Sequence, residues 1–269
     1  MTSRNAATAA LLCIFLASCS SVAITQSGAL SSYSNLSSQS RSSDAKTFVD
    51  RRGVASARTI AIVPASLSAS ASAQIPTLED GALVANAVDR AMCLALAEKF
   101  EMVRSGNVAD ITIHATVSNI VPTGKTAAGI SKVATLGTSA VLPVGVPRLP
   151  IGLGGLAVEI EALDAAGQQK AAMTWAKGAN SITSSARISE IGDAYGLAGA
   201  AGRRFARIIA EASDDPGFRL PSAERVATSL GGRSRSEVCE DFGRSTGFAG
   251  LAGSMLGAPP SWSDGGYRQ

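Results

Sequence analysis

The first eighteen residues constrain this chain most, because they predict that folding begins only after them. Arg4 and the amino terminus make the start positive, and residues 6–17 then form an uncharged apolar run. The run is too short to cross a bilayer as a helix, which needs about 20 apolar residues. A positive start and a short apolar run are typical of a secretory signal peptide. We therefore predict that residues 1–18 direct export and are then removed.

The end of this leader resembles the lipobox of bacterial lipoproteins. Small residues stand before a cysteine in the run Leu16-Ala17-Ser18-Cys19. We expect cleavage between Ser18 and Cys19, and palmitate-like acyl chains on Cys19. Two or three chains bury dozens of methylenes at about 0.8 kcal/mol each, which is enough for a stable anchor. By analogy with lipoprotein sorting, Ser20 favours a periplasm-facing place on the outer membrane. An ordinary secretory signal that ends near a chance cysteine is the alternative.

Composition divides the mature chain into three parts. Residues 19–57 hold the lipidated cysteine and a serine-rich tether, which cannot bury enough apolar surface to fold alone. Residues 58–212 form the folded domain, and residues 213–269, rich in Gly, Ser, Pro and Arg, are expected to be a largely disordered tail. Short helical pieces are predicted within the tail near residues 222–230 and 237–242.

The sequence of residues 58–212 predicts an α+β fold. Its clearest element is residues 110–121, where apolar and polar residues alternate as in a half-exposed strand. A turn at residues 164–167 separates two further strands. The order β-α-β-β-β-β-α predicts a mostly antiparallel sheet with both helices packed on one face. The predicted strands are residues 58–63, 100–103, 110–121, 156–163 and 169–177, and the predicted helices are residues 77–99 and 190–212.

Four short pieces stand out when the chain is taken as a whole. One of them spaces Leu30, Tyr33 and Leu36 three apart, which predicts a short turn docking on the domain. The pieces are SGALSSYSNL (27–36), ALAEKFEMV (95–103), VLPVG (141–145) and VEIEALD (158–164). Together they resemble a family of uncharacterised proteobacterial outer-membrane lipoproteins defined by a domain of unknown function. The resemblance implies an envelope lipoprotein and brings no activity, ligand or catalytic residue.

Two patterns match known motifs only formally. Residues 152–157 fit a glycine-rich dinucleotide fingerprint but precede a strand, where that fingerprint needs a helix. Ser43 and Lys46 fit the Ser-x-x-Lys pair of penicillin-binding enzymes, but they lie in the tether without a helix to align them. Chance is the better explanation for both.

The remaining candidates for chemistry are one histidine and one acidic pair. His114 is the single histidine and falls on the polar side of its strand, where we expect it to be solvated. Glu159 and Glu161 share one strand face. A carboxylate pair in a cleft would suit hydrolysis of an envelope polymer, but alternating carboxylates usually mark a solvated face. We therefore predict no catalytic residue, no metal site, no cofactor and no small-molecule substrate.

Cys93 and Cys239 are the cysteines that remain beside the lipidated one after cleavage. A projection of the helix at 100° per residue places Cys93 amid Asn86, Asp89 and Arg90, on an exposed side. Exposed thiols in an oxidising compartment tend to pair. We predict a disulfide between Cys93 and Cys239 that fastens the tail to the domain; two free cysteines are the alternative.

A long apolar stretch, residues 126–156, carries only Lys132 and Arg148 as charges. It predicts either a loop helix over the open face of the sheet, or a surface that enters the membrane or receives a partner. Nucleic-acid binding would need a concentrated basic face. Since 24 basic and 21 acidic residues are spread along the chain, we expect no nucleic-acid partner.

These features predict a membrane-anchored binding or scaffolding module of the cell envelope that is not an enzyme. The expected partner, besides the membrane, is an envelope protein or a second copy of the chain. One alternative is an oligomeric pore or secretion component formed through the apolar stretch. The other is an enzyme acting on envelope polymers.

Overall fold

The structure is a computed structural model of the whole chain. The leader, with Ser18 and Cys19, lies outside the described residues, as does most of the apolar stretch at 126–156 and the helical piece expected near 222–230. The described residues are 22–38, 44–124, 152–180, 189–212, 234, 236–244 and 258–264.

Every strand and helix predicted for the domain is present, together with additional elements. The strands are β1 (Ala45–Val49), β2 (Thr59–Ile62), β3 (Ser66–Leu67), β4 (Glu101–Val103), β5 (Ile111–Val121), β6 (Gly155–Asp164) and β7 (Gln169–Gly178). The described residues hold six helical segments, against the two packed helices that the sequence predicts. They are α2 (Arg51–Ala55), α3 (Ala69–Ser72), α4 (Leu78–Leu96), α6 (Gly192–Ala212), the 3-10 helix η2 (Glu237–Phe242) and α9 (Pro260–Ser263).

The strands form one mixed sheet in the order β1-β7-β6-β5-β2-β4, with β3 beside β5. The neighbours β1/β7, β7/β6 and β6/β5 are antiparallel, whereas β5/β2, β2/β4 and β3/β5 are parallel. The expectation of a mostly antiparallel sheet is therefore wrong. The parallel pairing of β2 and β4 follows from α4, which lies between them in the chain. As a helical crossover, α4 brings the chain back so that β4 runs in the same direction as β2. Strand β5 pairs on the other side of β2 and is also parallel to it.

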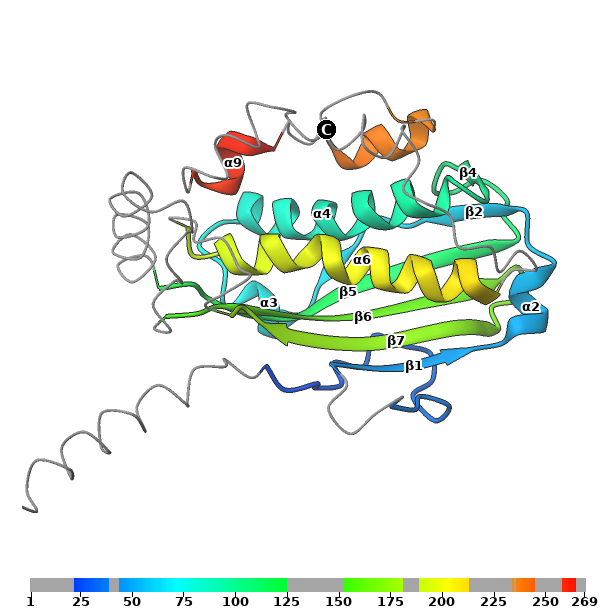
Figure 1. Cartoon of the computed structure of the whole chain (residues 1–269), viewed down its shortest axis with the longest axis horizontal. Coiled ribbons are helices and arrows are strands. Elements are labelled where there is room, and N and C mark those ends of the chain that lie inside the picture. Colours follow the sequence, from blue (N-terminus) through cyan, green and yellow to red (C-terminus); the bar gives the residue numbers. More distant parts are fainter. Residues whose placement is uncertain are drawn as a thin grey trace, which may run out of the picture.

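Helices α4 and α6 lie side by side on one face of this sheet, as predicted (Figure 1). Thr77 caps α4 by accepting a hydrogen bond from the amide of Asp80, 3.1 Å away. The two helices approach most closely at Gly202, where an added Cβ would stand 2.3 Å from the carbonyl oxygen of Val88. Their inner sides and the sheet form a single core that includes Met92, Leu96, Ile113, Ile160, Phe205 and Ile209.

Both flanking segments are more ordered than the sequence predicts. Residues 22–38 lie on the side of the sheet opposite to α4 and α6 (Figure 1), and residues 44–55 supply β1 and α2. On the helix side, η2 and α9 of the tail pack against α4. The helical piece predicted at residues 237–242 is confirmed by η2, whereas β1, α2 and α9 lie in segments for which the sequence predicted no regular structure. Single apolar residues within each polar segment, such as Leu30 and Phe242, are buried because the domain supplies their partners.

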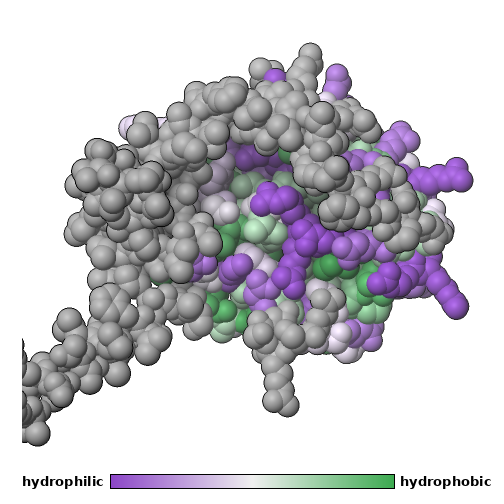
Figure 2. Space-filling model, viewed as in Figure 1, coloured by the Kyte–Doolittle hydropathy of each residue, from purple (hydrophilic) through white to green (hydrophobic). Residues whose placement is uncertain are grey.

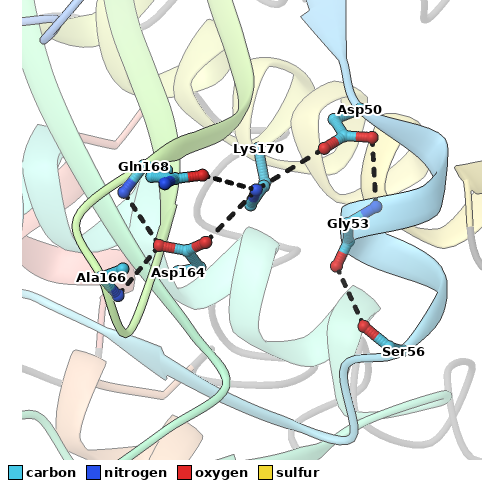
Figure 3. A network of polar contacts seen from close by, with 7 residues as sticks. All are labelled: Asp50, Gly53, Ser56, Asp164, Ala166, Gln168 and Lys170. Carbon is cyan, nitrogen blue, oxygen red and sulfur yellow. Dashed lines mark hydrogen bonds and ion pairs between the residues drawn. The ribbon is translucent and has the colours of Figure 1, made fainter.

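The turn predicted at residues 164–167 is confirmed and belongs to a polar network (Figure 3). The carboxylate of Asp164 accepts hydrogen bonds from the amides of Ala166 and Gln168, at 2.9 and 2.8 Å. The Gln168 amide, acting with other local donors, lowers the pKa of Asp164. The Nζ of Lys170 lies 3.2 Å from Asp164 and 3.6 Å from Asp50, the residue that caps α2. The network thus joins the β6–β7 hairpin to α2.

Two glycines of α6 test the close helix contact. We expect Gly202→Ala to destabilise the domain by about 1–3 kcal/mol, because the added methyl overlaps the α4 backbone and pushes the helices apart. Gly196, in the same helix, has nothing within 4 Å of an added Cβ. Gly196→Ala should therefore stabilise the domain by about 0.5–1 kcal/mol through helix propensity. Equilibrium unfolding in urea measures both, and equal effects of the two substitutions would contradict this packing.

Candidate functional site

Two glutamates on the open face of β6 are buried, although the sequence favours a solvated face. Glu159 is 1% exposed and Glu161 is 5% exposed. Their side chains point away from α4 and α6, because residues of opposite parity, such as Val158 and Ile160, belong to the core. Burying a carboxylate is costly unless hydrogen-bond donors replace water. The donors come from residues 27–33, called the strap below.

Four groups of the strap bind Glu159. Its Oε1 accepts a hydrogen bond from the amide of Ser27 at 2.7 Å. Its Oε2 accepts from the hydroxyl of Ser27 at 2.8 Å and from the amide of Ala29 at 3.2 Å. The hydroxyl of Tyr33 donates to the same oxygen at 2.6 Å. Both carboxylate oxygens of Glu159 are therefore engaged.

Glu161 binds the next part of the strap. Its Oε2 accepts from the amide of Ser31 at 2.9 Å and from the Ser31 hydroxyl at 2.7 Å. The side-chain amide of Gln169, on β7, donates to the same oxygen at 2.8 Å and to the carbonyl of Ser32 at 3.1 Å. The strap therefore presents alternate residues to two carboxylates that are themselves two residues apart on their strand.

The strap is also folded upon itself. The hydroxyl of Tyr33 accepts hydrogen bonds from the amides of Gly28 and Leu30, at 2.9 and 3.3 Å. Burial, reinforced by the hydrogen bond to Glu159, raises the pKa of Tyr33. The donors to the two carboxylates named above are all neutral. Hydrogen bonds to an ionised group are stronger than those between neutral groups. The hydrogen bonds from the strap to Glu159 and Glu161 therefore hold the strap firmly on this face of the sheet.

A shallow groove of about 530 Å³ runs beside the strap on the same face. Its lining includes His114 and Thr116 of β5, Ser66 of β3 and the start of the strap. His114 is exposed. The glycine-rich residues 152–157 lead into β6, and Lys46 is exposed on β1, so neither formal motif gains the helix its chemistry requires. Within the described ranges, no group of three or more His, Cys, Asp or Glu side chains could hold a metal ion.

The tail closes the helix side of the domain. Cys93 and Cys239 are joined by a disulfide, with an S–S distance of 2.04 Å. The helical projection that exposes Cys93 is wrong, since η2 packs on α4 there and Cys93 is buried. Nearby, Arg90 contacts the Asp264 carboxylate at 2.8 and 3.0 Å, and the Tyr195 hydroxyl donates to Asp264 at 2.6 Å.

Sequence reasoning found one half of the strap site and missed the other. The spacing of Leu30, Tyr33 and Leu36 predicts a turn docking on the domain, and the structure places that segment on the sheet. The expected solvent exposure of Glu159 and Glu161 is wrong, because alternation along a strand does not reveal whether a distant segment covers that face. The usable signal was the serine-rich strap itself, which offers many donors and few charges.

These observations define an α+β domain whose mixed sheet is closed on one face by helices and on the other by an N-terminal strap. The chain belongs to the family described as protein of unknown function DUF3313, whose profile matches residues 25–205. The match includes the strap and most of α6. No curated protein matches the chain.

Among solved structures, the chain is similar to a leucine-to-methionine variant of the PelC dodecamer from Paraburkholderia phytofirmans. The two share 11% sequence identity with a TM-score of 0.37, over 64% of this chain and 98% of that chain. None of the helices in the described part of the chain has both the length and the hydrophobicity needed to span a bilayer.

We expect Glu159→Gln to lower the free energy of strap opening by about 1–3 kcal/mol. The glutamine side chain carries no charge, and its NH2 group would face hydrogen-bond donors of the strap. Hydrogen exchange at the amides of residues 27–33 measures the effect, which should leave the amides of α4 unchanged. Glu101→Gln, at an exposed strand position, is the matched control. Unchanged exchange of the strap in Glu159→Gln would contradict the role given to this carboxylate.

A third carboxyl, Asp89 on α4, is buried with an incomplete set of partners. Its Oδ2 accepts from the amide of Ala65 at 2.7 Å, and its Oδ1 has no hydrogen-bond partner. Burial raises the pKa of Asp89 from 3.8 to about 7. The Asp89 carboxyl therefore stays protonated in the folded chain at pH values where it is already ionised in the unfolded chain.

The stability of the domain should consequently fall as the pH rises from about 4 to about 7. A pKa difference of one corresponds to about 1.4 kcal/mol, so the contribution of Asp89 is on the order of 4 kcal/mol. Urea unfolding across this pH range measures the slope, and Asp89→Asn should flatten it. Asp241→Asn, at an exposed carboxyl, should leave the slope as it is. A slope that survives in Asp89→Asn would assign the pH dependence to other groups.

Proposed function

We propose that this chain is a lipid-anchored module of the cell envelope that binds or scaffolds other envelope components without catalysis. Its lipid would be carried by Cys19, exposed by cleavage after Ser18, and its place would be the periplasmic side of the outer membrane. The partner would be an envelope protein or a second copy of the chain. The observation that carries the proposal is the strap, which fastens the start of the mature chain to the folded sheet.

The strap limits how far the domain can lie from the proposed lipid anchor. Ser27 is bound to Glu159 and stands eight residues after Cys19. An extended chain covers at most about 3.3–3.6 Å per residue, so this link spans less than about 30 Å. A free tether of residues 19–57 would allow a far wider range of positions. Such a short, fixed link suits a module that must stand at a defined height and orientation on a membrane.

The same geometry supports a non-catalytic role. Glu159 and Glu161 are the acidic pair that an enzyme acting on envelope polymers would need. Both are covered by the strap and hydrogen-bonded to it, so neither is free to donate a proton to a substrate or activate water. Among the described residues that line the groove with the exposed His114, no catalytic nucleophile motif is present.

Labelling of cells with a clickable palmitate tests the proposed anchor. We expect label on the full chain, recovery in the outer-membrane fraction and loss of both in Cys19→Ala. Cys13→Ala, which changes the leader cysteine that is removed, should keep the label. In the same cells, crosslinking and mass spectrometry should join the exposed surface to an envelope protein or to a second copy. Label that persists in Cys19→Ala, or a native chain that begins elsewhere, would refute the lipoprotein assignment.

A further inference from the structure

The mature chain enters the fold at one end of the sheet. Val22 lies over the start of β6, where an added Cβ on Gly155 would stand 2.2 Å from the Val22 side chain. Val22 is the third residue after Cys19, so the chain between them reaches at most about 10 Å. If Cys19 carries acyl chains, its sulfur sits at the depth of the lipid headgroups. The end of the domain at which β6 begins must then lie close to the bilayer surface.

Two large hydrophobic side chains are exposed at this same end. Leu78 opens α4 and is 88% exposed, and Trp262 of α9 is 78% exposed. Figure 1 shows the start of α4, helix α9 and the start of β6 at one end of the long axis of the molecule. Val108, which is 94% exposed, belongs to the loop between β4 and β5 at the other end.

Trp262 is held outward by the residues on either side of it. Pro260 is buried, and Asp264 is bound to Arg90 and Tyr195. The helical turn between them is thus fixed at both ends, and the indole is directed away from the domain. Tryptophan is enriched where membrane and water meet, since its ring is apolar and its N–H needs a polar partner.

The far end of the molecule has a different character. It carries α2 and the β6–β7 hairpin with the charged network of Asp50, Asp164 and Lys170 (Figure 3). Figure 2 shows hydrophilic side chains projecting at that end of the molecule. The two ends therefore suit two different surroundings, one the lipid headgroups and the other water.

We propose that the end formed by Val22, Leu78 and Trp262 rests on the bilayer, with the indole of Trp262 among the lipid headgroups. The proposal rests on the lipid anchor of the proposed function and adds which face of the domain meets the membrane. The strap and the disulfide-bonded tail hold the contacting residues in place from opposite sides of the sheet. The polar end with α2 then points away from the membrane, toward any partner.

Tryptophan fluorescence provides the test, because the chain contains only Trp175, buried in β7, and Trp262. The full lipidated protein is placed in vesicles of phosphatidylethanolamine and phosphatidylglycerol that carry bromine on the upper acyl carbons. We expect bromine to quench part of the emission and Trp262→Phe to abolish that quenching. In Trp262→Phe with Val108→Trp, the new indole at the opposite end should stay unquenched.

Flotation of the same vesicles separates the two proposals. A chain that floats with its Trp262 unquenched, or with the indole at position 108 quenched equally, overturns the orientation and leaves the anchor intact. A chain that does not float refutes the lipid anchor, and the proposed orientation falls with it. Quenching confined to Trp262 in floating protein supports both.

Discussion

The burial of two neighbouring carboxylates on β6 is the constraint around which one half of this structure is organised. Glu159 and Glu161 cannot lie under a cover unless that cover supplies donors, since a buried charge without hydrogen bonds is prohibitively costly. The strap supplies them from its backbone amides, serine hydroxyls and Tyr33. Beyond the strap, Ser37 pairs with Thr47 at the outer edge of β1, so the same segment also protects an edge strand.

The helix side is closed in a corresponding way from the other end of the chain. Helices α4 and α6 meet at a contact so close that only glycine fits at position 202. The tail then covers α4 through the disulfide of Cys93 and through the ion pair of Arg90 with Asp264. Arg90 and Asp264 are both largely buried, so their pairing is specific to this placement of the tail. The two ends of the chain thus complete opposite faces of one sheet.

The sequence predicted those parts of the fold that depend on local pattern. Alternation predicts the strand at 110–121, and the turn at residues 164–167 is predicted from residues adjacent in the chain. The parallel pairing of β2 was missed, because it is set by how far α4 carries the chain. The environments of Glu159 and Cys93 were misjudged for the same reason: each is covered by a segment more than a hundred residues away. Local patterns carry no information about such distant covers.

One consequence of the strap concerns the order in which the chain can fold. The segment that covers Glu159 is made first, yet its binding strand lies about 130 residues later. Until the strap docks, that face of the sheet presents carboxylates to water rather than hydrocarbon. An intermediate without its strap therefore stays wettable and resists aggregation, which exposed apolar faces promote. The strap can therefore dock last, after the strands that it covers have formed the sheet.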